Sequence, residues 1–217
     1  MKLILDIASG KYDTQLFQSS NDIIVHVDRC FTSSFSKTID EIANDVYQHL
    51  TFNNVEYTKT LQHYFCKSDI FEFLDNFPIK CFDCINCNRF FEHLEYCSGE
   101  IGRMIEACNV ITKRDAEMTF IVPNHEKLAQ MILNKNYTDN DVMVINTEFC
   151  NIRCDPHLSI WTPELAHRYI DQEATWKIVD IDPNITFAGR NIYMKVTCHK
   201  GNGLAQEDST DSSDLPF

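Results

Sequence analysis

The feature that most constrains this chain is a short segment with five potential metal ligands, Cys81, Cys84, Cys87, His93 and Cys97. Two overlapping Cys-x2-Cys spacings precede a His-x3-Cys spacing. A turn that carries Cys-x2-Cys can aim two thiolates at one ion, and residues four apart on a helix share a face. The segment therefore predicts a tetrahedral structural zinc site that joins a turn to the start of a helix.

Three ligand sets fit this cluster, and they resemble a zinc knuckle, a short finger and a ribbon. Their members are, in that order, Cys84, Cys87, His93 and Cys97; Cys81, Cys84, His93 and Cys97; and His63, Cys66, Cys84 and Cys87. Each set closes the coordination shell with protein ligands, which indicates a structural ion. The alternative is that the thiols are small buried core residues, a role that suits Cys97 on the apolar stripe of its own expected helix.

A second, weaker candidate metal site combines Cys150, Cys154 and His157, with Cys198 or His199 as a distant fourth ligand. The chain has ten cysteines, and an acidic residue interrupts its first apolar run too early for a secretion signal. We therefore expect the thiols to meet a reducing compartment, where such spacing indicates metal binding rather than disulfides.

Composition and charge narrow the class of protein. Hydrophobic residues make up 44% and charged residues 24%, which is ordinary for a globular chain. The formal net charge of -13 makes nucleic acid a poor partner for any broad surface, because such binding needs clustered Lys and Arg. No run approaches the roughly 20 apolar residues that span a bilayer. We expect a soluble intracellular protein whose partners are proteins and not membranes.

Hydrophobic periodicity predicts the elements of the first half. Short apolar runs predict strands at 3–7, 13–17 and 22–27 in a small antiparallel sheet. A capping-box pattern starting at Thr38 precedes apolar residues at helical spacing, which predicts a helix at 38–50. Further helices are expected at about 58–74 and from Asn88 to Cys108.

The second half alternates between strand and helix patterns. Strands are expected at 118–122, 142–149, 176–181 and 191–198, and helices at 124–135 and 162–172. The whole predicts an α+β fold in three parts. Residues 1–110 hold the N-terminal strands and the helical zinc-binding segment, residues 111–200 form an α/β segment packed on it, and residues 201–217 form a disordered acidic tail.

Signals for catalysis are weak. The motifs Gly-x-Gly-x-x-Gly, Gly-x-Ser-x-Gly and His-Glu-x-x-His do not occur, and six glycines leave little room for a phosphate-binding loop. The best acidic group is Asp180 and Asp182 at a strand end, which could hold Mg²⁺ together with Asp6 or another acid in a metal-dependent nuclease or related hydrolase. The same residues fit an ordinary strand-to-turn sequence. We interpret the chain as not an enzyme and keep the nuclease as the alternative.

Three features occur together in this chain. They are a mid-chain Cys/His cluster from Cys81 to Cys97, an Ile- and Asn-rich composition typical of AT-rich coding DNA, and the lack of an enzyme motif. In these respects the chain resembles the small zinc-finger regulatory proteins of nucleopolyhedroviruses, which are insect viruses with large DNA genomes. The resemblance implies a viral factor, present in nucleus and cytoplasm, that promotes replication or late gene expression. The sequence thus predicts a noncatalytic, zinc-stabilised regulatory or adaptor protein that acts through protein-protein contacts.

Overall fold

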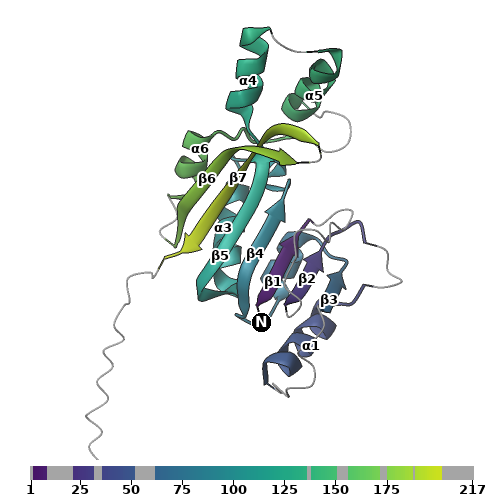
Figure 1. Ribbon diagram of the computed structural model, residues 1–217. Helices are drawn as coiled ribbons and strands as arrows, with labels where there is room; N and C mark the ends of the chain where they lie inside the picture. The colour runs from purple at the N-terminus through teal and green to yellow at the C-terminus, as the bar shows by residue number, and fades with distance from the viewer. Residues whose placement is uncertain are drawn as a thin grey trace, which may run out of the picture.

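Seven strands of this chain form one sheet in the order β3-β2-β1-β4-β5-β7-β6 (Figure 1). The structure is a computed structural model that describes residues 2–8, 22–31, 36–51, 62–135, 138–150, 156–171, 175–187 and 189–201. The strands are β1 Leu3–Ile7, β2 Ile23–Val27, β3 Gln62–Cys66, β4 Phe82–Asn88, β5 Thr112–Pro123, β6 Trp176–Phe187 and β7 Arg190–Lys200. The expected mixture of helices and strands is confirmed.

Strands β1 to β5 pair in parallel, whereas β7 runs antiparallel to both β5 and β6. The expected antiparallel sheet at the N-terminus is therefore wrong. All five residues of β2 are buried, and a strand buried on both faces is typical of parallel sheets, whose faces are covered by other segments. The strand expected at 13–17 and the acidic tail beyond residue 201 lie outside the described residues.

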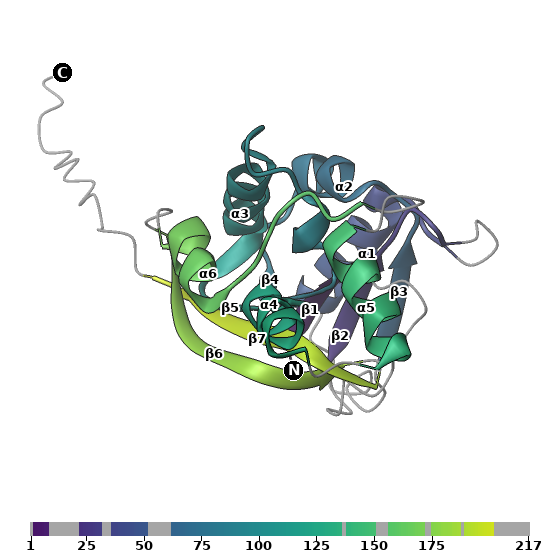
Figure 2. The ribbon, with the colours of Figure 1, turned by 90° about the horizontal axis from the view of Figure 1, so that it is seen from above.

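Six α-helices and one 3₁₀ turn accompany the sheet in the described residues. They are α1 Ile39–Thr51, α2 Ile70–Asn76, η2 Phe91–His93, α3 Glu100–Ile111, α4 His125–Asn134, α5 Asp139–Cys150 and α6 Pro163–Ile170. Figure 2 shows α2, α3 and α6 together on one face of the sheet. Helices α4 and α5 stand instead beyond the end of β5, above the edge where the parallel strands finish (Figure 1).

Three of the expected helices begin at residues that cap them. At α1, Thr38 and Glu41 form the reciprocal capping box, since the Thr38 N–H donates to the Glu41 carboxylate at 2.8 Å and the Glu41 N–H donates to the Thr38 hydroxyl at 3.3 Å. Asn124 caps α4 and Thr162 caps α6 by accepting backbone N–H groups. The helices expected at 38–50, 124–135 and 162–172 are confirmed.

Three expected elements differ in the structure. The helix expected at 58–74 is replaced by β3 and α2, separated by a turn. The helix expected from Asn88 to Cys108 is divided, because β4 extends to Asn88 and Gly99, with φ of 78°, starts α3 only at Glu100. The strand expected at 142–149 is the helix α5.

Two clusters of buried side chains hold the fold together. The larger one lies between the sheet and the helices and includes Trp161, Trp176 and Phe82. The smaller one joins α4 and α5 to β5 and β7 through Ile121, Leu128, Val144, Ile192 and Tyr193. The boundary expected between the first two parts of the chain is at residue 110. Strands β4 and β5 lie on either side of it and pair directly within the sheet. Among the described residues, no helix has the length and apolar character needed to cross a membrane.

The Thr162 cap provides a test of the local structure. Its hydroxyl accepts the Leu165 N–H at 3.1 Å, so Thr162→Ala should lower the free energy of unfolding in urea by about 1 kcal/mol. Thr147→Ala is the matched control inside α5, where the Thr147 hydroxyl donates to the Met143 carbonyl, and alanine should stabilise the helix by a few tenths of a kcal/mol. Equal effects of the two substitutions would contradict the assigned cap.

Candidate functional site

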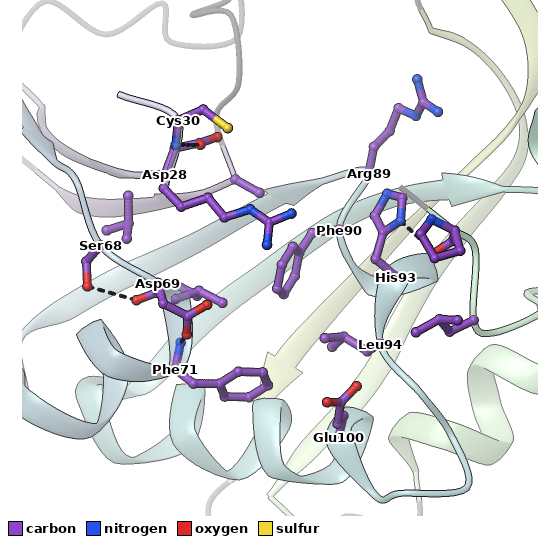
Figure 3. A pocket seen from close by; sticks show the side chains of 16 residues that line it. Asp28, Cys30, Ser68, Asp69, Phe71, Arg89, Phe90, His93, Leu94 and Glu100 are labelled. Atoms are coloured by element: carbon purple, nitrogen blue, oxygen red, sulfur yellow. Dashed lines mark hydrogen bonds between the residues drawn. The ribbon is translucent and has the colours of Figure 1, made fainter. Parts of the chain in front are cut away.

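A cavity of about 510 Å³ opens at the carboxyl ends of the parallel strands (Figure 3). Its walls come from Ala8 after β1, the turn 28–30 after β2, residues 68–71 after β3 and the segment 89–94 after β4. Strands β2 and β3 lie on one side of β1, and β4 and β5 lie on the other, so the strand order reverses at β1. In open α/β sheets, ligands bind in the crevice outside the carboxyl ends of the strands at such a reversal.

The end of β1 adopts a backbone conformation that favours glycine. Ala8 has φ of 53°, and its N–H donates to the Val27 carbonyl at 2.9 Å. In dinucleotide-binding α/β folds the first turn after β1 carries a glycine-rich sequence that lets a ligand approach the backbone. Here the turn continues as Ser9-Gly10, outside the described residues. Because Ala8 stands where such folds carry a glycine, the sequence has no complete glycine motif at this turn.

Asp28 lies directly after β2 on the wall of the cavity. One oxygen of its carboxylate accepts the Cys30 N–H at 2.7 Å, and the Asp28 N–H donates to the Cys66 carbonyl at 3.1 Å. These bonds fix the carboxylate at the end of the strand. An acid in this place of the fold can accept hydrogen bonds from the hydroxyls of a ribose.

Another part of the cavity wall combines a helix start with apolar side chains. The Asp69 carboxylate caps α2 by accepting the Phe71 N–H at 2.9 Å. Phe71, in the first turn of this helix, lines the cavity. Phe90 and Leu94 contribute further apolar surface (Figure 3). The Arg103 guanidinium lies 4.4 Å from the centre of the Phe71 ring. An acid beside flat apolar walls is chemistry that suits a nucleoside.

A buried polar network begins at Arg89 on the far side of the cavity. Glu148 of α5 is fully buried, and its carboxylate lies 3.4 Å from one guanidinium nitrogen each of Arg89 and Arg190. It also accepts the Tyr193 hydroxyl at 3.0 Å. Burial raises the pKa of Tyr193 to about 12, so this hydroxyl stays a neutral donor. A buried carboxylate needs such partners, and they tie α5 to β4 and β7.

Two histidines meet beside this network. His93 of η2 and His157 lie edge to face with ring centres 4.9 Å apart. The Nδ1 of His93 lies 3.1 Å from the Pro156 carbonyl, and the Nδ1 of His157 lies 2.6 Å from the Glu148 carbonyl. Burial lowers the pKa of His157 and favours its neutral form. One histidine from each of the two metal sites expected from sequence therefore lies beside the other.

The cysteines of the expected cluster are spread over different parts of the fold. Cys84 and Cys87 lie three residues apart on β4, and side chains at that spacing on a strand point to opposite faces. Cys81 is buried just before β4, whereas Cys97 is exposed before α3. A Cys-x2-Cys spacing binds one ion from a turn, and here the spacing belongs to a strand.

Cys81, just before β4, and Cys87, on β4, belong to the larger cluster of buried side chains. Burial raises the pKa of Cys81 to about 12 and raises that of Cys87 well above its usual value. The ribbon-like set fails as well, because β1 and β2 separate His63 and Cys66 on β3 from β4. The expectation of a structural zinc is wrong.

The second metal site expected from sequence lies partly outside the described residues, which include neither the side chain of Cys150 nor any part of Cys154.

The acidic site expected from sequence is divided between distant strands. Asp180 and Asp182 lie on the edge strand β6, and four strand spacings of about 4.8 Å separate that strand from Asp6 on β1. These three carboxylates cannot share one Mg²⁺, so the nuclease site expected from Asp6, Asp180 and Asp182 is wrong.

Comparisons with known proteins identify the fold. No protein-family model matches the sequence, and a search of curated proteins finds no match. An S-adenosylmethionine (SAM)-dependent methyltransferase from Methanosarcina mazei superposes with a TM-score of 0.56 at 13% identity, covering 92% of each chain.

Two further solved structures were determined with S-adenosylhomocysteine bound. They are 1,6-didemethyltoxoflavin-N1-methyltransferase from Burkholderia thailandensis (TM-score 0.56, 12% identity, 92% of this chain and 71% of that one) and a mycolic acid cyclopropane synthase (TM-score 0.52, 11% identity, 92% and 78%). At such identities the likeness shows the fold, which is the Rossmann-like fold of SAM-dependent methyltransferases.

This finding corrects the functional interpretation of the sequence. The resemblance to nucleopolyhedrovirus zinc-finger regulators is wrong, because the structural neighbours are SAM-dependent methyltransferases. The interpretation as a noncatalytic adaptor that is not an enzyme is wrong for the same reason. The sequence does carry one usable signal: an acid in the first buried strand, a glycine soon after it, and Asp28 after the next buried strand.

The placement of the cysteines predicts their reactivity. In the native protein at neutral pH, iodoacetamide should modify the exposed Cys30 and Cys97 first and leave Cys81, Cys87 and Cys108 protected, as peptide mass spectrometry would show. Treatment with EDTA should leave this pattern unchanged. If EDTA instead exposed Cys81, Cys84 and Cys87 together, the three thiols would share a metal and their assignment to the core would be refuted.

Proposed function

We propose that this chain is a SAM-dependent methyltransferase. The observation that carries the proposal is the cavity at the reversal of strand order, with Asp28 on its wall directly after β2. The fold likeness to enzymes of this class, two of them solved with S-adenosylhomocysteine, supports it. The volume of about 510 Å³ lies in the usual range of about 300–1,000 Å³ for small-molecule sites.

The residues present fit the adenosyl part of this cofactor. Asp28 would accept hydrogen bonds from the ribose hydroxyls, and Ile70, Phe71 and Phe90 would contact the faces of the adenine ring. Ala8 brings the backbone of the first turn to the same cavity. When bound, SAM supplies an electrophilic methyl group on a sulfonium ion.

The acceptor would enter from the side opposite Asp28. Residues after β2 and β3 lie at one end of the cavity, and Arg89 and His93 lie toward the other (Figure 3). Arg89 is held there by the buried Glu148, so this end has fixed charges and a fixed shape. A rigid pocket accelerates methyl transfer mainly by holding the two reacting atoms close together and in line.

Replacement of Asp28 tests the proposal. Asp28→Asn removes the charge that would accept the ribose hydroxyls, and hydrogen bonds to a charged group contribute about 1.5–3 kcal/mol. Isothermal titration calorimetry should therefore show S-adenosylhomocysteine binding at least tenfold more weakly to the variant than to the unmodified protein. Asp115→Asn makes the same change at an exposed position near the amino end of β5 and should leave the affinity unchanged.

Two results would refute the proposal. One is that the unmodified protein, with its melting transition intact, does not bind S-adenosylhomocysteine even at millimolar concentration. The other is that Asp28→Asn and Asp115→Asn bind it equally well, because the ligand would then not contact the end of β2.

A further inference from the structure

We propose that Glu92, His93 and His157 form a binding site for one divalent transition-metal ion beside the cavity, whose wall includes His93. Each residue offers one ligand atom, and the three atoms lie within 4.8 Å of one another. Two imidazoles and one carboxylate make a facial set that leaves positions for water or a substrate oxygen. Such a site differs from a structural one, in which protein ligands occupy every position.

The hydrogen bonds of the two rings prepare them for a metal. A carbonyl oxygen can only accept, so the bonds to Pro156 and Glu148 place the proton of each histidine on Nδ1. In a neutral ring the lone pair is then on Nε2. Metal-binding histidines show this pattern, with the other ring nitrogen bonded to a carbonyl or carboxylate. The Nε2 of His157 is buried, and no described residue forms a hydrogen bond with it.

The backbone joins the two segments that carry the ligands. Glu92 and His93 belong to η2, and the Glu92 carbonyl accepts the N–H groups of Leu158 and Ser159 at 2.7 and 3.1 Å. The Ser159 hydroxyl donates to the Phe91 carbonyl at 3.0 Å. The segment that carries His157 is thus fastened to η2, and the ligand geometry does not depend on side-chain packing alone.

The ligand atoms must move closer together to bind one ion. Ligand atoms about 2.1 Å from a tetrahedral ion lie roughly 3.4 Å from one another, so atoms now within 4.8 Å must approach by up to about 1.4 Å. Arg89 lies near the Glu92 carboxylate, with Nε and Oε1 3.7 Å apart. A bound ion would replace Arg89 as the partner of the Glu92 carboxylate, and Arg89 would keep its contact with Glu148.

The position suggests what the ion would do. His93 lies on the cavity wall, at the end away from Asp28. A metal there could bind an oxygen or nitrogen of a small molecule that enters the cavity, because two imidazoles and a carboxylate favour borderline ions with exchangeable ligands. The site is defined by metal binding alone and does not rest on the proposed methyl transfer.

Cobalt titration tests the site directly. The full chain, treated with EDTA and dialysed, would be titrated with Co²⁺ while its absorption is recorded. We expect one ion per chain, with visible bands from nitrogen and oxygen ligands and without the near-ultraviolet band of a cobalt-thiolate bond. The absence of that band separates this site from binding to the cysteines.

Variants identify the ligands. His157→Gln and His93→Gln should each weaken Co²⁺ binding at least tenfold, whereas His167→Gln, an exposed histidine on α6, should bind Co²⁺ as the unmodified protein does. Melting curves without metal verify that each variant is folded, and His93→Gln decides the matter if His157→Gln is not. Failure to saturate at one ion, thiolate bands, or unchanged affinity in a folded variant of His93 would overturn the proposal.

Discussion

The parallel pairing of β1 with β2 on one side and β4 on the other is the constraint on which the rest of the structure depends. Because both neighbours run in the same direction as β1, the turns after all three strands emerge at one edge of the sheet. The strand order reverses there, so the connecting segments diverge and leave a cavity. Asp28, Ala8 and Arg89 line one ligand site because each follows one of these three strands.

The second determinant is the buried carboxylate of Glu148. A buried charge is tolerated only with partners, and Arg89, Arg190 and Tyr193 supply them from β7 and the turn after β4. This network fixes α5 against the sheet and holds Arg89, which lines the cavity. The same helix offers its Glu148 carbonyl to His157, so the network and the pair of histidines form one assembly.

Local signals in the sequence predicted several elements but not the site. The Thr38 and Thr162 caps and the apolar residues at the start of β2 determine structure within a few residues, so they could be read directly. The β-branched residues of 142–149 suggested a strand, but Thr138 caps a helix there by a reciprocal bond with Asp141. Cys84 and Cys87 have metal-binding spacing, but their strand points them apart. His93 and His157 meet only through tertiary contacts, which no spacing rule reveals.

The most direct test of the account is a crystal structure of the protein grown with S-adenosylhomocysteine. We predict that the adenosyl group lies at the carboxyl ends of β1, β2 and β3, with its ribose hydroxyls donating to Asp28 and its adenine beside Phe71. A ligand bound elsewhere, or a cavity that stays empty in crystals saturated with it, would contradict the assignment of this crevice as a methyl-donor site.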